Sequence, residues 1–68
     1  MVYLNIKHLL EKNNKSRYWL VKKLDSNYTV INNMVNNKTY AIRFDTIDKL
    51  LNLFNCKIDE LFIVENED

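Results

Sequence analysis

Residues 16–37 read SRYWLVKKLDSNYTVINNMVNN, and this stretch decides the fold. The pattern predicts two short helices joined by a tight turn. When residues 28–36 are placed about 100° apart on an ideal helix, apolar side chains fill one arc and polar side chains fill the opposite arc of roughly 140°. The apolar arc holds Val30, Ile31, Met34 and Val35, and the polar arc holds Tyr28, Thr29, Asn32, Asn33 and Asn36.

The polar arc carries no charge, which separates it from an ordinary solvated helix face rich in Lys and Glu. Uncharged amide and hydroxyl groups are the side chains that hydrogen-bond base edges in a DNA groove. Asn32 and Asn33 can each present a donor and an acceptor to adenine, and Thr29 can contact a thymine methyl group. The absence of Arg and Lys from this arc predicts contacts to A·T-rich steps.

The first helix of the pair is predicted to begin after Ser16 as N-cap. Trp19 stands where a capping box would place Glu, and we expect its ring to pack over the first helix of the chain rather than to form an exposed partner contact. Asp25-Ser26-Asn27 forms the turn, with Asp25 in the left-handed region and Asn27 or Ser26 capping the next helix. So short a connection makes the two helices cross steeply, as in a helix-turn-helix.

Apolar stripes at helical spacing predict further helices on both sides of this pair. A first helix is expected over residues 2–13, a fourth over 45–54 and a last short turn over 58–62. Residues 38–44 are expected to form a loop with Ile42 and Phe44 in the core. The apolar run Leu61, Phe62, Ile63 and Val64 either packs within the chain or contacts a second copy as a dimer interface, and both alternatives stay open.

The length of 68 residues indicates one domain, expected over 1–64 with an acidic tail at 65–68. One Cys and one His cannot assemble a disulfide framework or a four-ligand zinc site, so we expect no metal and no cofactor. Catalytic constellations are not recognisable, which predicts a protein that is not an enzyme. The polar N-terminus does not resemble a signal peptide or membrane span, so a cytoplasmic location is expected.

Charge is distributed unevenly along the chain. Residues 1–43 carry eight Lys and Arg against two acidic residues, a net charge of +6, whereas residues 44–68 carry a net charge of −5. This asymmetry predicts a basic face for a polyanion. Lys38 and Arg43 flank the predicted loop as candidate phosphate contacts.

Glycine and proline are both absent, while asparagine occurs eleven times. Turns that require a positive φ must therefore use Asn or Asp, the next most tolerant residues. Asn13-Asn14 and Asn36-Asn37 are expected to end helices in this way.

A series of short motifs at matching intervals resembles the Cro/repressor helix-turn-helix family, the xenobiotic-response-element type, over about residues 5–62. The matching segments are Ile6, Leu9 and Leu10, Ser16-Arg17-Tyr18-x-Leu20-x-Lys22-Lys23-Leu24, Ser26-x-Tyr28-Thr29-x-Ile31, Asn36-x-Lys38-Thr39, Asp45-Thr46-Ile47-x-Lys49-Leu50 and Asn55-Cys56-x-x-Asp59-x-Leu61.

The resemblance implies an all-α bundle of four to five short helices with the lambda-repressor-like fold, and helix 28–36 in the major groove. It implies a transcriptional regulator, with double-stranded DNA as partner and a homodimer at least on DNA. A protein-interaction module on the same fold is the alternative. The implied base contacts are Asn27, Tyr28, Thr29, Asn32 and Asn33, and the implied phosphate contacts are Ser16, Arg17, Asn36, Lys38 and Arg43.

Overall fold

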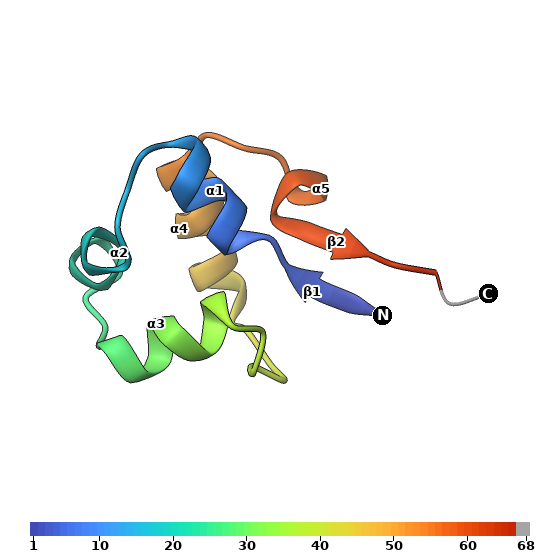
Figure 1. Cartoon of the computed structure of the whole chain (residues 1–68), viewed down its shortest axis with the longest axis horizontal. Helices are drawn as coiled ribbons and strands as arrows, with labels where there is room; N and C mark the ends of the chain where they lie inside the picture. Colours follow the sequence, from blue (N-terminus) through green and yellow to red (C-terminus); the bar gives the residue numbers. More distant parts are fainter. Residues whose placement is uncertain (67–68) are drawn as a thin grey trace.

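The computed structural model describes residues 1–66 and consists mainly of five short helices (Figure 1). This arrangement confirms the expected helical bundle and adds one small antiparallel sheet. The elements in chain order are β1 (Val2–Leu4), α1 (Ile6–Lys12), α2 (Arg17–Lys23), α3 (Tyr28–Val35), α4 (Phe44–Phe54), α5 (Ile58–Leu61) and β2 (Phe62–Val64).

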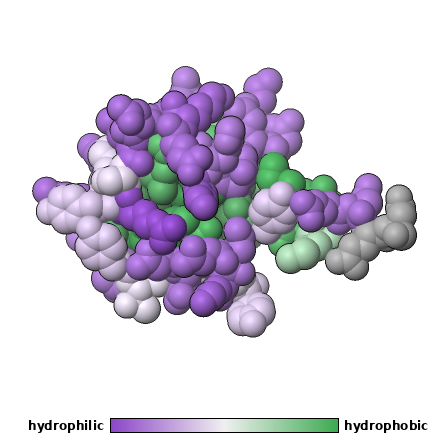
Figure 2. Space-filling model, in the orientation of Figure 1, coloured by the Kyte–Doolittle hydropathy of each residue, from purple (hydrophilic) through white to green (hydrophobic). Residues whose placement is uncertain are grey.

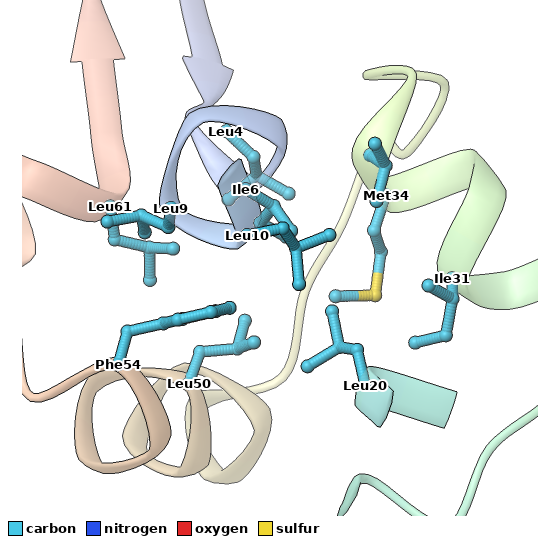
Figure 3. Packing of buried hydrophobic residues seen from close by; sticks show 11 residues of the cluster. Leu4, Ile6, Leu9, Leu10, Leu20, Ile31, Met34, Leu50, Phe54 and Leu61 are labelled. Carbon is cyan, nitrogen blue, oxygen red and sulfur yellow. The ribbon is translucent and has the colours of Figure 1, made fainter. Parts of the chain in front are cut away.

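The core lies where the five helices meet, and each helix contributes one side chain with no exposed surface (Figure 3). Burying a Leu or Ile side chain contributes about 1.5–3 kcal/mol, so these side chains fix the bundle. The remaining core residues surround them, including Met34 and Val35 from the predicted apolar arc of α3. The five fully buried side chains are Ile6, Leu20, Ile31, Leu50 and Leu61.

The helices α1 to α4 all end in the same backbone motif without glycine. One left-handed residue follows each helix, with φ between 48° and 58°: Asn14, Asp25, Asn37 and Asn55. At the end of α3, the Asn37 N–H donates to the Met34 carbonyl at 3.2 Å and the Lys38 N–H donates to the Asn33 carbonyl at 2.7 Å. This pair of bonds is a Schellman motif, which satisfies carbonyl groups that the helix leaves without partners.

The predicted helix over residues 2–13 is wrong at its N-terminal end. Residues Val2–Leu4 form β1, which pairs antiparallel with β2, and α1 begins only at Ile6. Val-Tyr-Leu has the β-branched and aromatic character that suits a strand, and the apolar run 62–64 offers the partner strand. Val2 therefore lies opposite Val64 instead of extending the helical stripe.

Asn37 connects the end of α3 to the sheet. Its side-chain oxygen accepts from the Leu4 N–H at 2.6 Å, and its amide group donates to the Leu4 carbonyl at 3.0 Å. A glycine would accept the same φ but would leave both groups of Leu4 without these bonds. The asparagine thus serves as a helix terminator and as a substitute for a neighbouring strand.

The loop between α3 and α4 is only partly as expected. Ile42 is half-buried against the core, as predicted. Phe44 is 90% exposed, so the prediction that it enters the core is wrong. The apolar stripe of α4 runs through Leu50 and Phe54, which are buried, and Phe44 at the start of the helix faces away from the core. Tyr40 in the same loop is also exposed.

The C-terminal apolar run is packed only in part within the protomer. Leu61 is fully buried, so it has no surface to offer a second chain, whereas Phe62 and Ile63 are half-buried and Val64 is exposed. Glu65, expected in the acidic tail, exchanges hydrogen bonds with Met1. Residues 67 and 68 of that tail lie outside the described residues.

Replacing Asn37 with Gly should lower the free energy of unfolding by about 2 kcal/mol, because two partly buried backbone groups of Leu4 lose their partners. Asn55→Gly is the matched control, since Asn55 also has positive φ but has no side-chain hydrogen bond within residues 1–66. It should change stability by less than about 1 kcal/mol. Urea unfolding measures both variants, and equal effects would contradict the role given to the Asn37 amide.

Candidate nucleic-acid interface

The helix α3 presents the two faces that its sequence predicts. Ile31, Met34 and Val35 are buried in the core. On the opposite face Tyr28, Thr29, Asn33 and Asn36 are exposed and Asn32 is half-buried. This outward face carries only hydrogen-bonding groups without charge, so the fold displays the polar arc to a partner. Val30, at the edge of the apolar arc, remains exposed.

Side-chain caps fix the first turns of α2 and α3. The Ser16 hydroxyl accepts from the Trp19 N–H at 3.1 Å, as the N-cap prediction requires. The Asn27 side-chain oxygen accepts from the Val30 N–H at 3.0 Å. Asn27 therefore has its oxygen engaged by the helix, and its NH₂ group is the part available to DNA.

Two predicted DNA contacts are hydrogen-bonded to one another. The Arg17 Nη1 donates to the Asn32 side-chain oxygen at 2.6 Å, joining the start of α2 to the polar face of α3. Both residues are half-buried. The bond restrains the orientation of the amide, and the Asn32 NH₂ group has no hydrogen-bond partner among residues 1–66. One of the two lone pairs of its oxygen is then engaged, so the donor–acceptor pair expected at adenine competes with Arg17 for that oxygen.

Aromatic packing also joins the two helices, through Tyr28 and through Tyr18, which is not among the predicted contacts. The rings of Tyr18 and Tyr28 stack with their centroids 6.2 Å apart and an angle of 24° between planes. The Lys22 Nζ lies 5.3 Å from the Tyr18 ring centroid. Tyr28, a predicted base contact, is therefore held against α2. In the sequence, Tyr18 could have been noticed from its position four residues before Lys22, a spacing that puts two side chains side by side on a helix.

Trp19 packs on α4. Its ring lies 5.7 Å from the ring of Phe54, and the Lys15 Nζ lies 5.3 Å from the Trp19 centroid. The indole is half-buried. Packing within the chain is thus confirmed over an exposed partner contact, and α4 supplies the aromatic neighbour.

The predicted phosphate contacts lie at helix ends around α3. Ser16 and Arg17 begin α2, Asn36 and Lys38 follow α3, and Arg43 precedes α4. The Arg43 guanidinium forms an ion pair with Asp45 at 3.1 Å, and both side chains are largely exposed. An exposed pair of this kind contributes at most about 1 kcal/mol, so it does not prevent Arg43 from binding a phosphate.

A shallow hollow between α3 and α4 brings a further cation to this side of the molecule. It has a volume of about 220 Å³ and is lined by Val30, Thr39, Arg43 and Lys49, among others. Lys49 comes from the half of the chain that is acidic in net charge. Counting charge along the sequence does not identify Lys49 as part of the basic face. The folded chain places this residue of the acidic half beside residues of the basic half.

Residues 1–66 were also compared with the requirements of a metal site, a reactive thiol and a membrane-spanning helix. Among residues 1–66, no group of three His, Cys, Asp or Glu side chains is placed to hold a metal ion. Burial, followed by the nearby Glu60, raises the pKa of the Cys56 thiol, which disfavours the reactive thiolate. Within the same residues, no helix has the length and apolar character needed to cross a membrane.

The hydrogen bond between Arg17 and Asn32 should appear as energetic coupling in the free protein. Arg17→Ala and Asn32→Ala combined should give a coupling energy of about 1 kcal/mol in a double-mutant cycle of urea unfolding. The matched cycle pairs Arg17→Ala with Asn33→Ala, since Asn33 is the exposed neighbour without this bond. Its coupling energy should be near zero. Similar values in both cycles would refute the pairing.

Comparison with known families agrees with this geometry. The family model for the Cro/C1-type HTH DNA-binding domain matches residues 5–67. The matched region includes all five helices and the whole polar face of α3. No curated protein matches the chain.

Proposed function

We propose that this chain, which belongs to the family of Cro/C1-type HTH DNA-binding domains, is a sequence-specific transcriptional repressor that reads A·T-rich half-sites with α3. Placing α3 in the major groove brings its outward face against base edges. Repression requires only that the domain occupy DNA that transcription needs. No second protein surface has to be invoked for that role.

The uncharged outward face of α3 is the observation that carries the proposal. Asn33 is exposed, and its side chain has no hydrogen-bond partner among residues 1–66. It can therefore offer both its oxygen and its NH₂ group to adenine N6 and N7, a contact that discriminates by about 1–3 kcal/mol. Asn33 is the principal adenine-reading residue in this proposal.

The other side chains of this face have narrower roles. Asn32, whose oxygen is engaged by Arg17, donates from its NH₂ group to an acceptor such as purine N7 or thymine O4. Thr29 contacts a thymine methyl group, and Tyr28 presents its hydroxyl and ring edge beside it. The NH₂ group of Asn27, at the start of α3, donates to a base at the first base step that the helix covers. The face lacks the guanidinium forks that recognise guanine.

Phosphate contacts set the register of the domain on the duplex. Arg17 has further N–H donors besides the one that binds Asn32, so one guanidinium can orient an amide and bind a phosphate. Lys38 and Arg43 bind phosphates beyond the C-terminal end of α3. Ser16 and Asn36 contribute hydrogen bonds at the two helix ends.

Specific recognition by a domain of this size needs two copies. One α3 covers one half-site, and paired half-sites lie about 34 Å apart on one face of the duplex. We therefore propose that the chain binds as a homodimer. Two linked contacts raise the effective concentration of the second copy, which compensates for the small footprint of one domain.

Protein interaction on the same fold is the second candidate, favoured by the exposure of Tyr40 in the loop after α3 and of Phe44 at the start of α4. Exposed aromatic side chains are enriched at protein interfaces. Trp19, which such a surface would also use, is instead packed on Phe54. A binding constant for DNA that does not change with salt concentration would favour this second candidate.

Asn33→Ala should relax sequence choice at one position of the bound DNA by about 1–3 kcal/mol, because the bidentate contact to adenine is lost. Selection of bound sequences from random duplexes measures the change. Asn52→Ala on the exposed side of α4 is the control, and it should leave the selected sequence unaltered. An identical preference in wild type and Asn33→Ala would refute this readout.

Lys38→Ala should weaken binding to all duplexes and reduce the slope of log K against log salt by about 0.9, the value for one lost phosphate contact. Lys57→Ala removes the same charge at the start of α5, on the side of the molecule away from α3 (Figure 1). It should keep the wild-type slope. Titrations of an A·T-rich duplex at several salt concentrations test both variants, and equal slopes would exclude the Lys38 contact.

A further inference from the structure

We propose that the hollow between α3 and α4 binds a small amphipathic anion, a carboxylate on a compact apolar body, and that its binding releases the protein from DNA. The loop after α3 turns back to α4, so the hollow is bounded by both helices and by this loop (Figure 1). The binding site concerns the free protein and stands without DNA. The release rests on the proposed function, because it involves the phosphate contact of Arg43.

The floor of the hollow is apolar. It is formed by Ile31 and Met34, which are buried core residues of α3. Figure 2 shows hydrophilic side chains over most of the helical part of the molecule. Val30, which also lines the hollow, is nevertheless 44% exposed. An apolar ligand body in the hollow removes this surface from water, which is favourable.

The rim of the hollow is cationic. Arg43 and Lys49 line it and are both exposed, and none of its lining residues within 1–66 is Asp or Glu. The one acidic group on Arg43 is Asp45, which contacts the Nε atom at 3.1 Å. The four N–H groups on the two Nη atoms remain as donors. Guanidinium groups bind carboxylates through two parallel hydrogen bonds, so the rim favours a carboxylate.

Three hydroxyl groups supply further polar contacts. Ser26, Thr39 and Thr46 line the hollow and are half-buried, and their hydroxyls make no hydrogen bond with another side chain of residues 1–66. A hydroxyl can donate to a carboxylate oxygen. An apolar surface with a few placed polar groups is the common form of a small-molecule site.

The size of the hollow limits the ligand. Its volume of about 220 Å³ is smaller than the roughly 300–1,000 Å³ of pockets that hold drug-sized molecules. The occupant is therefore a small acid with a single ring or a short chain. A phosphate of the DNA backbone can reach the cationic rim, but it has no apolar body to cover Val30, Ile31 and Met34. The whole hollow suits a free amphipathic acid better than it suits the duplex.

Occupation of the hollow opposes DNA binding for two reasons. A carboxylate on Arg43 competes with the phosphate that this residue binds in the proposed function. The ligand also adds a negative charge beside α3, the helix that faces the negatively charged duplex. Coupling between two ligands is reciprocal, so DNA weakens binding of the acid by the same factor by which the acid weakens binding of DNA. The acid therefore acts as an inducer.

Benzoate tests the site in the free protein at low salt, with the methyl resonances of Val30, Ile31 and Met34 as the readout. Their shifts should saturate with a Kd of about 1 mM or lower. Acetate keeps the carboxylate without the body, and benzamide keeps the body without the charge. Both should bind at least about fivefold more weakly. Shifts that do not saturate, or binding of either control that equals benzoate, overturn the site.

Lys49→Gln locates the charge that holds the ligand. It should weaken benzoate binding by about two- to fivefold, the effect of one exposed ion pair. Because Lys49 is exposed, the variant should unfold in urea as wild type does. Lys57→Gln is the matched control, since Lys57 is exposed and does not line the hollow. It should bind benzoate as wild type does, and equal affinities of the two variants contradict the assigned site.

The release is measured by titrating an A·T-rich duplex at a fixed sodium concentration. Saturating benzoate should weaken wild-type binding by about fivefold, at the lower end of ordinary coupling between two sites. Sodium acetate at the same concentration is the control for ionic strength, and it should leave the affinity nearly unchanged. Benzoate that binds the hollow without altering DNA affinity overturns the release. Failure of wild type to bind DNA at all defeats the proposed function and leaves the result in the free protein in force.

Discussion

The double hydrogen bond between Asn37 and Leu4 is the constraint on which the arrangement of the molecule depends. It connects the end of α3 to the first strand, and the strand in turn holds β2 and the C-terminal end of α5. Because Asn37 also has positive φ, the same residue ends α3 and attaches the helix to the sheet. A single side chain thereby adds a direct link between α3 and the sheet to the packing of the core.

Asparagine performs in this chain the conformational work that glycine performs elsewhere, and it adds side-chain chemistry. At Asn14 and Asn55 the left-handed conformation is the visible requirement, and Asp25 meets it in the helix-turn-helix itself. At Asn37 the amide also replaces a strand. Asn27 and Asn32 use their oxygens to cap a helix or to bind Arg17, while their NH₂ groups have no hydrogen-bond partner among residues 1–66. The same residue type therefore builds the frame and faces the proposed DNA.

Recognition and orientation are linked across the two helices of the motif. Arg17 and Tyr18 of α2 hold Asn32 and Tyr28 of α3, so two of the five residues of the outward face are positioned by the neighbouring helix. Side chains positioned in advance lose less conformational freedom on binding. Asn33 is not held in this way, and it keeps both of its hydrogen-bonding groups for the partner. The division of roles follows from distances that only the folded chain establishes.

The sequence by itself determined the helix-turn-helix, the two faces of α3 and the left-handed positions, because these depend on local spacing and on the φ preferences of single residues. It predicted Ser16 as one cap for the same reason and left the other cap open between Ser26 and Asn27, which the structure assigns to Asn27. Only the tertiary structure decided that Val2–Leu4 is a strand, that Phe44 is exposed and that Leu61 belongs to the core. Local periodicity assigned Val2 to a helix, because the strand that pairs with it lies some sixty residues away in the chain. The bond between Arg17 and Asn32 is of the same kind: their proximity is a consequence of how two helices cross.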